Sequence, residues 1–205
     1  MPTVAVLDYG SGNLHSVARA LAHVGADVLV TDEGLRTAEA DALLIPGVGH
    51  FGHCVRAIRS LGLEETIGTF AASGRPLLGV CVGMQILYER SEEDPDPGLG
   101  LLPGACRRLP DTVKVPHIGW NDVSWTGTHP FVDGIADGAR FYFVHAYAPD
   151  TGDETVGTTE HGRPFTAVAS RGNVFATQFH PEKSGEAGLA IYANLVKALP
   201  RGDGR

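Results

Sequence analysis

The N-terminal half of the sequence alternates short apolar runs with stretches of helical periodicity, and this pattern restricts the fold more than any other. The apolar runs are Val4–Leu7, Val28–Val30, Ala42–Ile45 and Leu77–Val80. Apolar residues at helical spacing, Leu14 to Ala22, follow the first run, and helical stretches also fill the segment between the third and fourth runs. Strands joined through helices run parallel, and the helices cover both faces of the sheet. The sequence therefore predicts a three-layer α/β/α fold around a mostly parallel sheet.

The sequence beyond Arg90 has a different character. Ser91–Gly104 is acidic and then rich in proline and glycine, which indicates a loop. Five strand-like segments follow, namely Val113–Val115, Phe141–Tyr147, Thr155–Thr159, Phe165–Ala169 and Val174–Phe179. Arg171–Asn173 is typical of a hairpin turn, so we expect antiparallel strands that extend the parallel sheet. Ala187–Leu199 has the periodicity of a final helix.

Length and composition limit the possible functions. The 205 residues fit one domain, 1–205, with a frayed tail at 200–205. The net charge of −8 without a basic run argues against nucleic acid or an anionic membrane as partner, and no apolar stretch is long enough to span a bilayer. Three cysteines without a framework spacing, and an N-terminus without a signal-peptide pattern, favour a reducing, cytoplasmic location. No metal-ligand pattern occurs, and we expect neither a metal nor a cofactor.

The segment Leu77–Glu89 carries the strongest chemical signal. It runs from a buried strand through Cys81 into Met84–Glu89, which suits the start of a helix. Cys81 has a glycine two residues away on either side, which is the nucleophile-elbow pattern G-x-S-x-G with cysteine in place of serine. We expect a sharp turn that presents the sulfur at the sheet edge, where the first amides of the helix favour the thiolate. A small buried cysteine at a strand end fits the same pattern, so a base has to be found elsewhere.

His180 and Glu182 supply a base and an orienting group at the end of another predicted strand. Val174–Phe179 leads directly into His180-Pro181-Glu182, and residues i and i+2 of an extended segment point to the same side. Pro181 restrains His180 toward that extended conformation. Glu182 then accepts a hydrogen bond from one imidazole nitrogen and leaves the other as the base. The residues alone favour a Cys81–His180–Glu182 triad over a solvated surface turn.

Pro46–Gly49 is a candidate for binding an oxyanion. Attack of a thiolate on an amide carbonyl creates an oxyanion, which needs preorganised N–H donors. The amide of Val82, next to the nucleophile, is one candidate donor, and Gly47-Val48-Gly49 at a neighbouring strand end is another. Glycines at these positions allow a peptide plane to turn over. An ordinary tight turn explains the same residues, and both interpretations stay open at this point.

Other residues with reactive side chains have weaker claims. Gly10-Ser11-Gly12 follows the first strand but lacks the third glycine of a dinucleotide-binding motif, so nucleotide binding is not expected. The sequence assigns no role to the remaining candidates, which are His50, His53, His117, His145, Cys54 and Cys106.

Together the motifs resemble those of the class I (triad) glutamine amidotransferases. The matching segments are Gly79–Gln85 and Phe179–Glu182, in the same order along the chain. Within that family the chain is similar to the glutaminase subunits of imidazole glycerol phosphate synthases, from histidine biosynthesis. The more specific matches are Asp8–Leu14, Pro46–Gly49, Pro116–Asn121, Tyr142–His145 and His180–Ser184. Val82 stands where leucine is more usual and Ile118 where methionine is common, and neither change alters the expected chemistry.

The resemblance implies a fold and a reaction. The fold is flavodoxin-like, with antiparallel strands that extend the parallel sheet. The thiolate of Cys81 attacks the side-chain amide of L-glutamine, His180 transfers protons, and Glu182 orients His180. The other residues of the implied site are Gly49 and Val82 in the oxyanion hole, and Gln85, Gly47 and Val48 around the glutamine.

The resemblance also implies a partner. Ammonia released into water becomes protonated and is no longer a nucleophile, and we see no second domain in the sequence to receive it. By the family pattern, ammonia passes to a separate cyclase subunit, a (β/α)8 barrel, which makes imidazole glycerol phosphate and an aminoimidazole carboxamide ribotide. The partner-facing positions implied are Trp120, Asn121, Tyr142 and Lys183.

Two alternatives stay open. Glutaminase subunits that serve anthranilate, aminodeoxychorismate or pyridoxal phosphate synthesis share the triad, although they tend to lack Met84-Gln85 together with Pro181–Ser184. The other alternative is a non-catalytic flavodoxin-like binding module in which Cys81 is incidental. Glutamine hydrolysis in the presence of the partner separates this module from the enzymes.

Overall fold

A nine-stranded mixed sheet forms the centre of the structure, a computed structural model that describes residues 1–199. The order across the sheet is β2-β1-β3-β4-β12-β11-β10-β7-β8. In chain order its strands are β1 Thr3–Leu7, β2 Asp27–Thr31, β3 Ala42–Ile45, β4 Leu77–Val80, β7 His117–Trp125, β8 Ala139–His145, β10 Thr155–Glu160, β11 Pro164–Arg171 and β12 Val174–Thr177. The frayed tail predicted at 200–205 lies outside the described residues.

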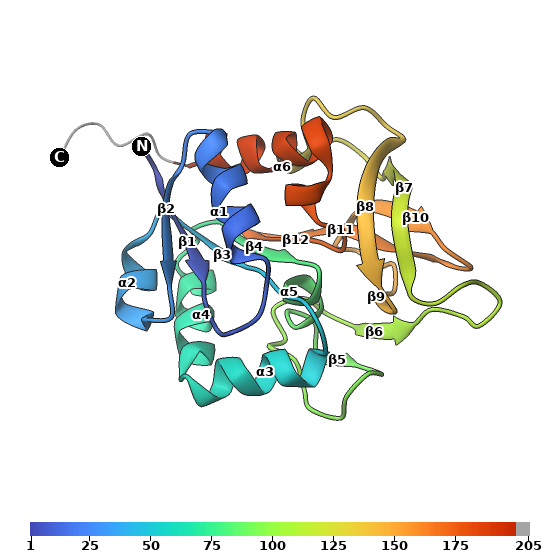
Figure 1. Cartoon of the computed structure of the whole chain (residues 1–205), viewed down its shortest axis with the longest axis horizontal. Coiled ribbons are helices and arrows are strands. Elements are labelled where there is room, and N and C mark those ends of the chain that lie inside the picture. The colour runs from blue at the N-terminus through green and yellow to red at the C-terminus, as the bar shows by residue number, and fades with distance from the viewer. Residues whose placement is uncertain (200–205) are drawn as a thin grey trace.

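The five strands from β2 to β12 run parallel, which confirms the prediction made from the alternation of strands and helices. Helices cover both faces of this part of the sheet (Figure 1). The helices α1 Leu14–His23 and α6 Gly185–Lys197 lie on one face, and α3 Phe51–Ser60, α4 Leu63–Ala72 and α5 Val82–Gln85 lie on the other. A short helix that the sequence did not predict, α2 Gly34–Glu39, packs against α4. Because helices shield both faces, the central strands β3 and β4 are apolar and buried throughout.

Strands β11, β10, β7 and β8 continue the sheet in antiparallel order, as predicted. β7 pairs with β8 along its length, from His117 opposite His145 to Val123 opposite Ala139. Stacked rings of Phe141 and Phe179, with centroids 4.0 Å apart, help to fill the inner face of this half. A second, three-stranded sheet contains β5 Arg90–Ser91, β6 Ala105–Arg108 and β9 Tyr147–Pro149, and two 3-10 turns, η1 Pro130–Val132 and η2 Pro181–Lys183, complete the elements.

The helix after Cys81 is shorter than the sequence predicted. We expected helical structure over Met84–Glu89, whereas α5 spans only Val82–Gln85. The segment Gly98–Leu102 ends the helix, because its amides donate to the carbonyls of residues 86–89 that a longer helix would use. The helix dipole at Cys81 is therefore that of a single turn, which weakens the electrostatic part of the prediction.

Two strand predictions were wrong. Val113–Val115 is not a strand, because the chain turns there and the Val113 amide donates to the Pro110 carbonyl. Phe141–Tyr147 is not continuous, because the chain changes sheets at Ala146: β8 pairs with β7, whereas β9 pairs with β6. The strands β6 and β7 were not predicted at all.

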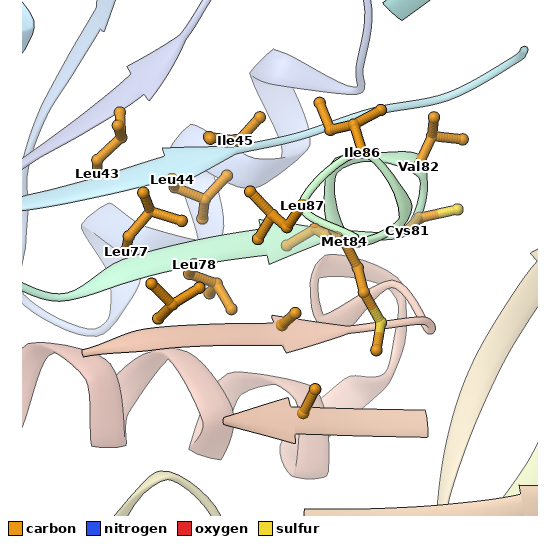
Figure 2. Close-up of a cluster of buried hydrophobic side chains, with 14 of the residues drawn as sticks. Leu43, Leu44, Ile45, Leu77, Leu78, Cys81, Val82, Met84, Ile86 and Leu87 are labelled. Carbon is orange, nitrogen blue, oxygen red and sulfur yellow. The ribbon is translucent and has the colours of Figure 1, made fainter. Parts of the chain in front are cut away.

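Apolar side chains from β3, β4 and α5 pack together beneath the sheet edge (Figure 2). Leu44, Leu78 and Leu87 in this cluster are fully buried. Burial of one such side chain stabilises a fold by about 1.5–3 kcal/mol, so the cluster holds the end of β4 firmly in place. Cys81 stands at the border of the cluster, and its sulfur points past the end of the strand (Figure 2).

Within the described residues, no helix combines the length and the apolar character that crossing a membrane requires.

Candidate active site

Cys81 occupies the sharp turn between β4 and α5 that the sequence predicted. Its φ is 56°, and no other non-glycine residue among residues 1–199 has a positive φ. Such a conformation costs of order 1–3 kcal/mol and is found mainly at functional sites, where the surrounding structure enforces it. The side chain is 2% exposed, and its sulfur lies 3.7 Å from the Val144 carbonyl oxygen.

The two glycines that flank the cysteine are required by close packing. A Cβ atom on Gly83 would lie 2.0 Å from the Ile45 carbonyl oxygen, and one on Gly79 would lie 2.6 Å from the Gly83 carbonyl oxygen. The one-turn helix α5 therefore rests with its backbone directly against β3 and β4. This confirms that the glycines make room for the turn.

The sheet topology brings the predicted base beside the predicted nucleophile. β12 is the parallel neighbour of β4, with Thr177 opposite Val80, and the Cys81 amide donates to the Thr177 carbonyl at 2.8 Å. The carboxyl ends of parallel neighbours meet at one edge of the sheet, so the residues after β12 lie beside the residues after β4. Cys81 and His180 accordingly line the same cavity.

His180 and Glu182 form a buried pair. His180 Nδ1 lies 2.9 Å from Glu182 Oε1, and the two side chains are 4% and 1% exposed. His180 itself is extended, as predicted, with φ −97° and ψ 100°. The residues after it form the 3-10 turn η2 instead of continuing extended, and the Lys183 amide donates back to the His180 carbonyl. The Tyr192 hydroxyl donates to the second oxygen of Glu182 at 3.4 Å.

The charges around His180 favour its protonated form. Burial lowers the pKa of the imidazole, but the Cys81 sulfur and the Glu182 carboxylate together outweigh burial and raise the pKa to about 10. Because Nδ1 is occupied by Glu182, Nε2 is the nitrogen available to the sulfur and to a substrate. The arrangement is that of a thiol nucleophile beside an imidazole, with a third group to orient the ring.

A cavity of about 140 Å³ opens at these strand ends. The lining residues that the sequence had singled out are Cys81, His180, Val82, Gln85, Val48, Gly49, Lys183 and His145. Gly47 is the exception, because it does not line the cavity and packs behind it. A Cβ atom on Gly47 would lie 2.4 Å from the Gly83 amide nitrogen, so a glycine here lets the loop pack closely against the elbow.

Two hydroxyl groups bond the loop after β3: Tyr9 donates to the Pro46 carbonyl at 2.5 Å, and Ser11 contacts Val48. Ser11 Oγ donates to the Val48 carbonyl at 2.8 Å and accepts from the Val48 amide at 3.1 Å. The Cys54 thiol also approaches the Val48 carbonyl, at 3.6 Å. Because the carbonyl and N–H of a trans peptide point in opposite directions, the Gly49 amide is directed away from Ser11. Gly49 has a φ of 88°, which glycine adopts without strain.

Among the residues that the sequence analysis missed at or near the cavity are two with side chains able to bind or orient groups there, Glu93 and Gln178. Glu93 lines the cavity and accepts a hydrogen bond from the Phe51 amide at 2.8 Å, but no periodicity marks it within its acidic loop. Gln178 is fully buried, and its side-chain nitrogen lies 3.9 Å from Cys81 Sγ. Gln178 stands two residues before His180. The same two-residue alternation that placed Glu182 beside His180 in the sequence analysis would therefore have indicated Gln178.

The four predicted partner-facing residues do not share one face. Trp120 is 47% exposed on β7, opposite Tyr142 on β8, and their ring centroids are 6.0 Å apart. Ile118, 58% exposed, extends this apolar surface, and Lys183 is exposed at the cavity. Asn121 lies on the other side of β7, because successive residues of a strand alternate, and it donates to the Glu160 carbonyl at 2.9 Å.

The remaining histidines and cysteines have structural surroundings. His117 Nδ1 lies 3.1 Å from His145 Nε2, and burial is the main cause that lowers the pKa values of these rings to about 4 and about 3, so both are neutral core histidines. His50 precedes α3 and accepts from the Gly52 amide. Burial raises the pKa values of the thiols of Cys54 and Cys106.

Known proteins resemble this chain in sequence and in fold. The family model for class I glutamine amidotransferases matches residues 5–198. The curated protein "Imidazole glycerol phosphate synthase subunit HisH" of Aromatoleum aromaticum is 45% identical, over 98% of this chain and 100% of that relative. Its namesake from Thiobacillus denitrificans is 47% identical, over 96% and 92%. The solved structure of PurLQS from Thermotoga maritima, 22% identical, shares the fold with a TM-score of 0.74 over 96% of this chain and 98% of the other.

Proposed function

We infer the function from the premise that this chain belongs to the class I glutamine amidotransferase family. The chain is the glutaminase subunit of an imidazole glycerol phosphate synthase: it hydrolyses L-glutamine and supplies the ammonia to a cyclase subunit. Identities of 41–47% to curated subunits of that enzyme, over nearly the whole chain, support this assignment. The observation that carries the mechanism is the meeting of Cys81 with the His180–Glu182 pair at one cavity.

The first half-reaction forms a thioester. The Cys81 thiolate attacks the side-chain carbonyl carbon of glutamine, and the new C–S bond gives a tetrahedral oxyanion. Collapse of this intermediate breaks the C–N bond, and His180 Nε2 gives its proton to the departing nitrogen, which leaves as ammonia. Glu182 keeps the other proton on Nδ1 throughout and so maintains the ring orientation and tautomer.

The second half-reaction releases glutamate. Neutral His180 now removes a proton from water, and the resulting hydroxide attacks the thioester carbonyl carbon. The C–S bond breaks, so that glutamate leaves and the thiolate–imidazolium pair is restored. Both oxyanions need N–H donors, for which we assign the amides of Val82 and Gly49 at the cavity.

Substrate recognition is assigned to the walls of the cavity. Gln85 and Val48 line it, and we assign them contacts with glutamine. The Glu93 carboxylate supplies a negative charge suited to the α-ammonium group of an amino acid. To Gly47, which the sequence had placed here, we assign the packing of the loop against the elbow.

The partner is a cyclase with a (β/α)8 barrel, and the complex works in the cytoplasm. Ammonia that escaped into water would be protonated, so the cyclase has to cover the cavity. The assigned contact surface is the exposed Trp120 on β7 and the half-buried Tyr142 on β8, together with Lys183 at the cavity. Asn121, bonded to the Glu160 carbonyl on the opposite side of β7, is a weaker candidate for this surface.

The test is reconstitution with a candidate cyclase. Glutamine and the phosphoribulosyl formimino carboxamide ribotide are supplied, and imidazole glycerol phosphate and glutamate are measured together. We expect the two products in equal amounts. Glutamate without imidazole glycerol phosphate would assign the chain to another synthase, such as those that make anthranilate, aminodeoxychorismate or pyridoxal phosphate. The absence of glutamate would leave the binding-module interpretation.

A further inference from the structure

Gln178 is a buried polar side chain that the mechanism above does not use. It follows β12 and is fully shielded from solvent. The pairing of β12 with β4 ends at Thr177 and Val80, so Gln178 and Cys81 are the first residues beyond these two neighbouring strands, and the Cys81 amide donates to the Thr177 carbonyl. Their position at the same edge of the sheet brings the Gln178 side-chain nitrogen to 3.9 Å from Cys81 Sγ.

The orientation of the Gln178 amide is fixed by a relay that begins at a backbone carbonyl. The Tyr147 carbonyl only accepts, so the side-chain atom of Gln85 that lies 2.7 Å from it is the nitrogen. The same nitrogen lies 3.0 Å from the Gln178 amide, and the atom that it contacts there must therefore be the oxygen. Nε2 of Gln178 is left on the side of Cys81 Sγ, at 3.9 Å.

Two polar groups of opposite character thus flank the Cys81 sulfur besides His180. The Val144 carbonyl oxygen, at 3.7 Å, accepts a hydrogen bond from the thiol and repels the thiolate. The Gln178 N–H donor stabilises the thiolate instead, and donors to an ionised partner form the stronger hydrogen bonds. Without Gln178, the carbonyl would be unopposed on this side of the sulfur.

We propose that Gln178 is a positioning residue that holds Cys81 in its thiolate form with the sulfur turned toward the cavity, and that Gln85 keeps the Gln178 amide in the required orientation. Both hydrogens of the Gln85 nitrogen are used in this relay, toward Tyr147 and Gln178. Only the Gln85 oxygen is then available to glutamine, as an acceptor. The consequence for turnover rests on the proposed glutaminase function, whereas the consequence for sulfur reactivity does not.

The experiment compares Gln178→Met with Thr177→Val in the full chain. Methionine keeps the length and shape of the side chain but has no N–H. Thr177 is equally buried and its hydroxyl bonds to the Phe179 carbonyl, away from the sulfur, so Thr177→Val is a matched loss of a buried polar group. The rate of Cys81 alkylation by iodoacetamide is followed against pH, with peptide mapping to assign the label.

We expect Gln178→Met to move the midpoint of the alkylation profile up by about one pH unit, which corresponds to about 1.4 kcal/mol. Thr177→Val should leave the midpoint in place. With the cyclase present, kcat for glutamine should fall roughly tenfold in Gln178→Met, with KM little changed, because the thiolate acts in the chemical step. An unchanged alkylation profile would overturn the proposal, even if glutamine turnover had been lost.

Two further measurements keep the outcomes distinct. Gln85→Leu should move the same midpoint in the same direction by a smaller amount, because Gln178 then loses the group that orients it. If Gln178→Met does not fold, as judged by thermal unfolding, Gln178→Leu and Gln85→Leu carry the test. If the wild-type chain with cyclase hydrolyses no glutamine, the proposed function fails, while the alkylation profiles still decide the role of Gln178.

Discussion

The two loops that line the cavity are held in place by different forces. At the elbow, backbone packs on backbone, and a single added carbon on Gly83 would lie 2.0 Å from the Ile45 carbonyl oxygen. At the loop after β3, a Cβ atom on Gly49 would meet nothing within 4 Å, and Val48 is 43% exposed. The peptide groups around Val48 depend chiefly on one hydroxyl, that of Ser11. The nucleophile is thus fixed by steric packing, whereas Val48 and Gly49, which follow the closely packed Gly47, depend on a few hydrogen bonds.

The difference indicates where the activity can be adjusted. Moving the elbow would break the close packing of α5 against two strands. Turning over a peptide beside Val48 breaks hydrogen bonds that each contribute only about 0.5–1.5 kcal/mol. A partner that regulates this site therefore acts most easily on the loop. The four predictions below test the elbow and the loop after β3 separately, beginning with the largest expected effect.

Removal of the nucleophile should have the largest effect. We expect Cys81→Ala to fold and to lower glutamine turnover by roughly 10⁴-fold or more. In complex with the cyclase it should still make product from ammonium salt, because the barrel does not need the thiol. A glutamine-like electrophile should label Cys81 alone, since burial raises the pKa values of the thiols of Cys54 and Cys106. Retained glutamine turnover, or label spread over all three cysteines, would contradict the assignment.

Glu182→Gln tests whether the base, His180, is held as firmly as the nucleophile at the elbow. The amide can hold the wrong tautomer of His180, so we expect turnover to fall by roughly 10³–10⁴-fold with the fold intact. Because Glu182 helps to raise the pKa of His180 toward about 10, its loss lowers that pKa. His180 then loses its proton at a lower pH, so the alkaline limb of the pH–rate profile shifts to lower pH. Tyr192→Phe, which removes the weaker contact to Glu182, is the matched control, and near-normal kinetics of Glu182→Gln would exclude the orienting role.

Activation by the cyclase tests whether the loop after β3 can be adjusted. We expect the isolated chain to be a poor glutaminase, and the cyclase with its ribotide ligand to raise kcat by about a hundred- to a thousand-fold, the usual worth of one oxyanion donor. The effect should fall on kcat more than on KM, because the donor acts on the transition state. Steady-state kinetics are compared for the chain alone, with cyclase, and with cyclase plus ligand. Equal kcat in the three samples would mean that the oxyanion hole is already formed.

Ser11→Ala should have the smallest effect. Unlike the two substitutions above, it should raise the rate of glutamine turnover. The hydroxyl holds both peptide groups that flank Val48, so its removal makes turning of either group easier. We expect the kcat of the isolated chain to rise by roughly 2–10-fold, with little change in the fully activated complex. Ser60→Ala, an exposed serine bonded within its own helix, is the control. A fall in the basal kcat would show that Ser11 supports the active loop instead.

The parallel half of the fold could be predicted from the sequence, and the antiparallel half only in part. β3 and β4, and β1 after Thr3, are short apolar runs, because helices bury both of their faces. β7 has no comparable signal: it contains His117, Gly119, Asn121 and Asp122, and it is a strand because β8 pairs with it along its length. Tertiary pairing decides such a strand, and local propensity does not.

The triad could be proposed from the sequence because each member sits at a strand end with a local signature. Glycines mark Cys81, and a proline marks His180. Glu93 and Gln178 lack such marks, and their positions depend on contacts with distant segments: Glu93 binds the Phe51 amide, and Gln178 depends on the pairing of β12 with β4. The length of α5 was mispredicted for the same reason, because amides of the distant segment Gly98–Leu102 bond to the carbonyls of residues 86–89.

The position of β12 in the sheet has a consequence for biosynthesis. β12, formed by Val174–Thr177, is last in sequence among the described strands, yet it lies in the middle of the sheet between β4 and β11. A ribosome-bound chain that has not yet exposed this segment has two unpaired inner edges, and such edges invite aggregation. Such a chain also holds Cys81 without His180, so we expect no glutamine hydrolysis before the segment that follows β12 has been made.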